Sequence, residues 1–275
     1  MKYALMIYGG FRTFRYCFHQ LLKYIHFDEL DYDVFILTER LESQNWSEEN
    51  EEIIRKMLGS KLKVFFYVQD IEKSYNLTEN ENKKVQEYYE KVEECKKEFK
   101  HIVDKKMFIT DTFCSKLFYR VWLQNQIRIK YEQDTDTKYD WIVRTRFDIG
   151  FRKEPMEPRL DILYSKPTPD IYYCILGMFS CGSPEVINYE SNFINSWCHC
   201  WNYYKQNKRL PSVFYTDDGE FDEVFFHYWV FMPEANIRCY MKDSKYPICE
   251  LNVAFQAVRY WLVDQYKIYD LKNKK

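Results

Sequence analysis

Glycine and proline are scarce in this chain of 275 residues, which has seven of the first and eight of the second. Together with 46% hydrophobic residues, this scarcity excludes a fibrous repeat and a disordered chain. No apolar run approaches the roughly 18 residues that a membrane helix needs. The apolar stretch at residues 3–8 is also too short for the core of a signal peptide. We therefore expect a soluble globular protein that stays in the cytoplasm.

An excess of charge of either sign is also missing. Forty Lys and Arg residues stand against forty-two Asp and Glu residues, which leaves a net charge of −2. A balanced chain has no broad electrostatic footprint for nucleic acid or anionic lipid, so we expect neither as a partner. The nine cysteines are odd in number and follow no export signal, which favours buried free thiols in a reducing compartment over a disulfide framework.

Apolar runs and helical periodicity alternate in the first part of the chain. This pattern predicts strands at residues 3–8, 33–38 and 61–68, separated by helices at residues 11–25 and 47–58. Parallel strands need crossover connections, so the order is typical of an α/β fold. We expect a Rossmann-like, mostly parallel central sheet flanked by helices.

The rest of the chain continues this pattern after one interruption. Residues 70–106 are rich in Glu, Lys and Asn and carry a few apolar residues at helical intervals, which is typical of an exposed helical insertion. Beyond it the pattern predicts helices at 112–131 and 184–204, and strands at 139–151, 171–174 and 178–181. With no interdomain linker, residues 1–275 are expected to form a single domain with a frayed basic tail at 272–275.

Three charged residues share one face of the strand expected at 139–151. Side chains alternate along a strand, so Arg144, Arg146 and Asp148 point to the same side. Burying these charges is costly unless they are paired or bind something. We expect Asp148 at the mouth of a crevice beyond the strand end, where its carboxylate could hold Mg²⁺ or Mn²⁺. The alternative is an internal Arg–Asp ion pair that joins strands.

A second candidate follows the first strand. Gly9 and Gly10 would let a ligand approach the backbone, and the helix after them would present N–H groups to an anion. Arg12 could add a bidentate contact to phosphate. The loop lacks G-x-G-x-x-G and the Walker Gly-Lys-Ser/Thr, so it indicates neither a dinucleotide site nor a P-loop. A plain tight turn explains the same glycines.

An acidic turn at residues 217–223 is the third candidate. If it faces the strand ends, Asp222 or Glu223 could act as a general base. Acidic residues also favour the first turn of a helix because they interact well with its dipole, so a capping role is the alternative.

Taken together, these segments resemble one enzyme family. The loop Gly-Gly-Phe-Arg-Thr-Phe at 9–14, the strand at 32–38 and Tyr-Asp-Trp-Ile-Val-Arg-Thr-Arg-Phe-Asp at 139–148 resemble sugar transferases of the GT-A fold. The likeness is to those encoded by large DNA viruses and by bacterial polysaccharide loci, and it covers roughly residues 1–230. It implies a hexosyl- or pentosyltransferase that moves a sugar from a nucleotide-sugar donor to a hydroxyl group of a glycan or glycoprotein. A viral origin would place it in the host cytoplasm.

The resemblance also implies roles for individual residues. Asp148 would be the metal ligand and Asp222 or Glu223 the catalytic base. The nucleotide-sugar side would consist of Gly9, Gly10, Arg12, Arg144 and Arg146, and the acceptor side would include Gly182 and Ser183. This chain has Arg146 where the family's D-x-D motif has its first acid. The arginine could therefore offset phosphate charge in place of Mn²⁺ or Mg²⁺.

Two other functions fit the same residues. One is another anion-handling transferase, such as a sulfotransferase, in which the loop at residues 9–14 holds a phosphate. The other is a non-enzymatic binding or assembly module that uses its tyrosine-rich surface for partners. The oligomeric state is left open by the sequence.

Overall fold

The computed structural model describes most of the chain. It covers residues 1–11, 13–40, 44–74, 112–151, 160–175, 179–195, 199–207, 233–251 and 255–257, with isolated positions between 86 and 97. Most of the predicted insertion at 70–106 and the whole tail at 272–275 lie outside the described residues. The statements below refer to the described part.

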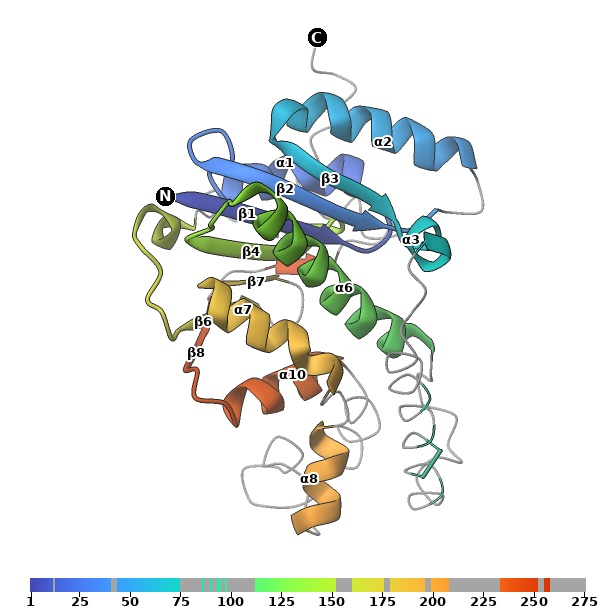
Figure 1. Cartoon of the computed structure of the whole chain (residues 1–275), viewed down its shortest axis with the longest axis vertical. Coiled ribbons are helices and arrows are strands. Elements are labelled where there is room, and N and C mark those ends of the chain that lie inside the picture. The colour runs from blue at the N-terminus through green and yellow to red at the C-terminus, as the bar shows by residue number, and fades with distance from the viewer. Residues whose placement is uncertain are drawn as a thin grey trace.

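A seven-stranded sheet forms the centre of the molecule, in the order β3-β2-β1-β4-β7-β6-β8 (Figure 1). Strands β1 to β4 are mutually parallel, β7 runs against β4 and β6, and β8 is parallel to β6. This is the mostly parallel sheet that the sequence predicts. The strands are β1 (Lys2–Tyr8), β2 (Asp31–Thr38), β3 (Leu62–Tyr67), β4 (Trp141–Arg146), β6 (Tyr172–Ile175), β7 (Phe179–Gly182) and β8 (Ile248–Glu250).

Helices cover both faces of the sheet (Figure 1). Helices α1 (Phe14–Tyr24) and α2 (Gln44–Leu58) pack on one face, and α6 (Thr112–Thr135) and α7 (Pro184–Ser191) lie on the other. Gln124 of α6 donates its Nε2 hydrogens to the carbonyls of Ile7 and Phe35, which fastens that helix across β1 and β2. The remaining helical segments are α3 (Val68–Ser74), α8 (His199–Asn207), α10 (Pro233–Lys242) and the short 3₁₀ turns η1 (Gly59–Lys61), η2 (Asp161–Tyr164) and η3 (Asn192–Asn195).

Aromatic side chains fill the core between α1 and the sheet. The ring of Phe147 lies between 5.3 and 6.0 Å from the rings of Phe11, Phe14 and Phe18, measured between centroids. Offset and edge contacts of this kind add to the free energy of burying the rings themselves. Phe147 therefore anchors the chain directly after β4 to the amino end of α1.

Two predicted elements are interrupted in the structure. The strand expected at 139–151 ends at Arg146, and after a two-residue turn β5 (Ile149–Phe151) leaves the main sheet to pair with β9 (Phe255–Ala257). The helix expected at 184–204 is divided into α7, η3 and α8. In both places apolar residues continue across the break, so periodicity alone does not reveal it.

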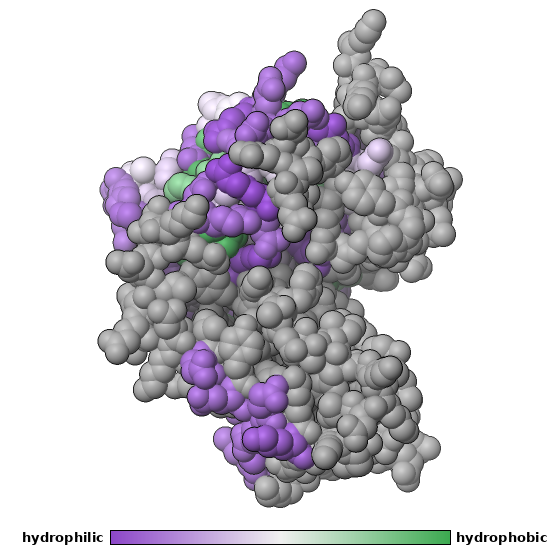
Figure 2. Space-filling view, turned by 90° about the vertical axis from the view of Figure 1, so that its right-hand side faces the viewer, coloured by the Kyte–Doolittle hydropathy of each residue, from purple (hydrophilic) through white to green (hydrophobic). Residues whose placement is uncertain are grey.

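The described cysteines and the surface in Figure 2 are typical of a globular protein. Five of the six described cysteines are buried as thiols, as the sequence predicts, and Cys249 is exposed. Burial raises the pKa of Cys17 to about 12, which keeps that thiol protonated.

The face in Figure 2 is mostly hydrophilic where residues are described, around a small hydrophobic area. None of the described helices combines the length and hydropathy of a membrane span.

Candidate functional site

The candidate site lies where the order of the strands reverses. From β1 the chain passes through α1 to β2 on one side, whereas β4 joins β1 on the other side. In open α/β sheets, ligands bind beyond the carboxyl ends of the strands at such a reversal. We call this border, formed by the last residues of β1 to β4 (Tyr8, Thr38, Tyr67 and Arg146), the carboxyl edge. Tyr8 and Arg146 are direct neighbours in the parallel register.

Gly9 begins the loop after β1 and has a backbone conformation that favours glycine. Its φ is +96°, its N–H donates to the carbonyl of Leu37 at 3.2 Å, and its carbonyl accepts from Thr38 Oγ1 at 2.9 Å. A Cβ atom on Gly9 would meet nothing within 4 Å. The positive φ and not crowding therefore calls for glycine here. Gly10 follows it, half-buried, and Arg12 lies outside the described residues.

Arg146 and Asp148 form a two-point ion pair at the end of β4. Arg146 Nε and Nη2 each donate to one carboxylate oxygen of Asp148, both at 2.9 Å. Asp148 is 2% exposed. The expectation that its carboxylate lies at the mouth of a crevice is therefore wrong. The structure contains an internal Arg–Asp pair, but this pair links two residues of one segment and not two strands, as the alternative expected. Asp148 lies in the two-residue turn that follows β4, close enough in sequence for the Arg146 side chain to reach its carboxylate.

This geometry does not fit Mg²⁺ or Mn²⁺ at Asp148. Such cations bind directly to carboxylate oxygens, and both oxygens of Asp148 already accept from a guanidinium that would repel the metal. Within the described ranges, no group of three or more His, Cys, Asp or Glu side chains could hold a metal ion. Asp222 and Glu223, the predicted bases, lie outside those ranges.

Arg144 belongs to a buried network and not to the carboxyl edge. It lies two residues before the end of β4, about 7 Å back along the strand at roughly 3.3 Å per residue. Its Nη2 donates to Glu190 of α7, which also accepts from the hydroxyls of Tyr172 and Ser180. Both Arg144 and Glu190 are buried. Burial raises the pKa of Glu190, against the opposing attraction of Arg144.

Glu190 is a partner that the sequence reasoning missed. A charged residue expected on a central strand implies a carboxylate on a covering helix, and α7 carries Glu190 on its inner face. The sequence gives no register between that helix and β4, because the two residues are 46 positions apart. The sequence therefore indicates that a buried arginine on β4 needs a carboxylate partner, but not that this partner is Glu190.

The residues expected on the acceptor side lie away from the candidate site. Gly182 pairs with Ile142, four residues before Arg146 and about 13 Å along the strand at roughly 3.3 Å per residue. Ser183 accepts from the Val186 N–H and so caps α7. A Cβ on Gly182 would lie 3.1 Å from the carbonyl oxygen of Ile171. Because β7 is antiparallel, its end lies at the border opposite the carboxyl edge, and packing accounts for both residues.

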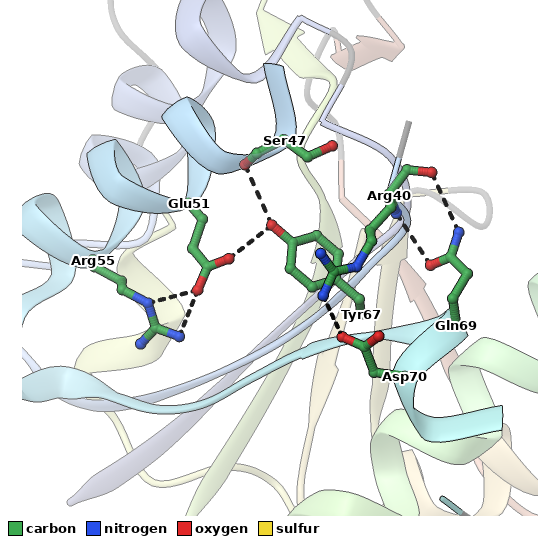
Figure 3. Close-up of polar contacts among 7 residues, drawn as sticks. All are labelled: Arg40, Ser47, Glu51, Arg55, Tyr67, Gln69 and Asp70. Carbon is green, nitrogen blue, oxygen red and sulfur yellow. Dashed lines mark hydrogen bonds and ion pairs between the residues drawn. The ribbon is translucent and has the colours of Figure 1, made fainter. Parts of the chain in front are cut away.

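The carboxyl edge continues past β2 and β3 into a polar cluster (Figure 3). The Arg40 N–H donates to Gln69 Oε1 at 3.1 Å, and Gln69 Nε2 donates back to the Arg40 carbonyl at 3.3 Å. The Arg40 guanidinium pairs with Asp70 at 2.6 Å and lies 4.2 Å from the ring centre of Tyr67. These contacts fasten the loop after β2 to the start of α3.

The other side of the cluster ties β3 to α2 (Figure 3). The hydroxyl of Tyr67 donates to Glu51 at 2.8 Å, and it lies 3.3 Å from the carbonyl oxygen of Ser47. Burial and the hydrogen bond to Glu51 raise the pKa of Tyr67, so its hydroxyl stays a donor. Glu51 also accepts from Arg55 one turn along α2. The ends of β2 and β3 are thus braced by residues from three elements.

No protein-family model matches the chain, and no curated protein matches it. A crystal structure of mouse xyloside xylosyltransferase 1 in its apo form is similar over 91% of this chain and 85% of that one, at 11% identity and a TM-score of 0.41. At that TM-score the two folds are only loosely alike, and the likeness says nothing of what this chain acts on.

Proposed function

We propose that the protein is a glycosyltransferase that moves a sugar from a nucleotide-sugar donor to a hydroxyl group of a glycan or glycoprotein. One observation carries this proposal: the glycine loop after β1 and the arginine that ends β4 meet at the reversal of the strand order. A diphosphate needs close backbone approach and a fixed positive charge, and Gly9 and Arg146 provide these two features side by side.

The proposed chemistry assigns one task to each group. The bond between the sugar and the donor diphosphate breaks, and its electron pair leaves with the diphosphate. The acceptor oxygen bonds to the sugar and loses its proton to a carboxylate, for which Asp222 and Glu223 are the proposed bases. Arg146 stabilises the charge that develops on the departing diphosphate. Arg12 is proposed as a second phosphate contact.

The test is a panel of nucleotide sugars assayed for donor hydrolysis and for thermal stabilisation, with and without Mn²⁺. We expect one nucleotide to raise the melting temperature, because a ligand at 100 times its Kd stabilises the folded state by about 2.7 kcal/mol. The same nucleotide, carrying the right sugar, should be hydrolysed slowly. Neither hydrolysis nor stabilisation by any donor would contradict the proposal.

A non-enzymatic binding module is the second candidate, and the burial of Asp148 favours it. A carboxylate that is 2% exposed and accepts a hydrogen bond at each oxygen from one arginine is typical of a structural ion pair. This candidate predicts that Asp148→Ala lowers the melting temperature while leaving the binding of every nucleotide unchanged. The glycosyltransferase proposal predicts that nucleotide binding changes as well.

A further inference from the structure

We infer that Arg146, oriented by Asp148, occupies the position that a divalent cation would have at the donor diphosphate, so that donor binding needs no metal. This inference rests on the proposed function. Because Asp148 does not fit a metal ion, the positive charge that contacts the donor diphosphate is that of Arg146.

Both carboxylate oxygens of Asp148 already accept from the Arg146 guanidinium. A divalent ion bound to either oxygen of Asp148, at about 2.1 Å for Mg²⁺, would lie within roughly 5 Å of the guanidinium nitrogen that the same oxygen already contacts at 2.9 Å. The two positive charges would repel each other in a site from which water is largely excluded. The structure therefore favours the arginine over a metal ion beside this carboxylate.

The arginine is the more accessible member of the pair. Its side chain is 10% exposed, against 3% for Asp148. Both donors that face Asp148, Nε and Nη2, lie in the guanidinium plane, so the two bonds fix the orientation of that plane. A charge held in advance loses little side-chain entropy when an anion binds. Asp148 is thus a positioning residue, and Arg146 is the residue that would contact phosphate.

The position of the pair links it to the glycine loop. Arg146 is the last residue of β4 and lies opposite Tyr8, the residue before Gly9. Phe147, between the paired residues, is anchored among the aromatic rings of Phe11 and Phe14. The glycine loop and the ion pair are therefore held against one another by the same core, as a fixed phosphate site requires.

The test measures the binding of UDP and of GDP by calorimetry, once in EDTA and once in Mn²⁺. We expect the preferred nucleotide to bind with the same Kd, within about threefold, in both buffers. Arg146→Gln should weaken binding by about tenfold or more, as loss of one charge-assisted hydrogen bond predicts, and Arg146→Lys should recover part of it. Asp148→Asn should shift the Kd equally in EDTA and in Mn²⁺. The control is Lys130→Gln, which removes an exposed cation of α6 and should bind as the parent does.

A second measurement keeps the inference testable if the Arg146 variants do not fold. Electron paramagnetic resonance of Mn²⁺ titrated into the parent protein with UDP or GDP should show the same signal as Mn²⁺ with that nucleotide in the absence of protein. A Kd that improves tenfold or more with Mn²⁺, a gain that Asp148→Asn removes, would overturn the inference but leave the proposed function intact. If neither UDP nor GDP binds in either buffer, the inference fails, whereas the proposed function fails only if the whole panel of nucleotide sugars gives neither hydrolysis nor stabilisation.

Discussion

At the scale of single residues, the spacing of Arg146 and Asp148 decides what the charged segment can do. Asp148 follows Arg146 by two residues, in the turn after β4, and the arginine reaches its carboxylate through two hydrogen bonds. In the order Arg-x-Asp the two side chains therefore form an ion pair with each other. Two acids at the same spacing would repel each other and would need a cation between them.

Gly9 can be tested against a second glycine whose φ is also positive. Gly9 and Gly59 both have positive φ, +96° and +53°, and in both cases a Cβ would meet nothing within 4 Å. Each Gly→Ala variant should therefore lose about 1–2 kcal/mol of unfolding free energy, from backbone strain alone. Only Gly9→Ala should also weaken nucleotide binding, because only Gly9 lies on the carboxyl edge. Urea denaturation and calorimetry on both variants check this, and equal nucleotide affinity in the two would place the ligand elsewhere.

At the scale of elements, Arg144 and Glu190 join α7 to the centre of the sheet. Glu190 gathers three donors, from β4, β6 and β7, so one helical residue ties together three strands. Such a buried pair is a poor source of net stability, but breaking it leaves a charge without a partner. Its role is to fix where α7 sits, and with it the outer strands that extend the sheet beyond β4.

Removing the arginine gives this contact a distinctive pH dependence. In Arg144→Met, the carboxylate of Glu190 keeps its burial and loses its cation, so the pKa of Glu190, already raised above its ordinary 4.5, rises further. A raised pKa contributes stability below pH 4.5 that is lost as the pH rises through the folded-state value. The variant should be less stable than the parent by about 3–5 kcal/mol at pH 7, and by less at pH 4.

The double variant Arg144→Met, Glu190→Gln separates the charge from the packing. With both charges gone, urea denaturation at pH 4 and pH 7 should show most of the lost stability restored at pH 7. The control, Arg55→Met, breaks an exposed pair and should cost no more than about 1 kcal/mol at either pH. A loss in Arg144→Met that is the same at both pH values would show that packing and not charge is responsible.

At the scale of the whole molecule, what the sequence could predict follows from how local each signal is. The first three strands and the helices between them were predictable because buried parallel strands are continuous apolar runs, as at residues 34–37, and because Gly59 marks a helix end. The direction of β7 was not predictable, since it depends on which neighbour the strand pairs with. Because β7 is antiparallel to β4, Gly182 and Ser183 lie at the border of the sheet opposite the carboxyl edge.

The two halves of the sheet give the last prediction, because a donor at the proposed site must touch both. The glycine loop belongs to the half made of β1, β2 and β3, and Arg146 ends the first strand of the other half. A ligand that binds only the folded state suppresses local opening where it makes contact. Hydrogen exchange with bound UDP or GDP should therefore slow together at residues 8–11 and 144–148, and stay unchanged at residues 160–165. Those control residues follow the opposite border, where Tyr3 Oη donates to the Leu163 carbonyl and Trp141 Nε1 to that of Ser165. Slowing in one half alone would mean that the nucleotide does not span the reversal between β1 and β4.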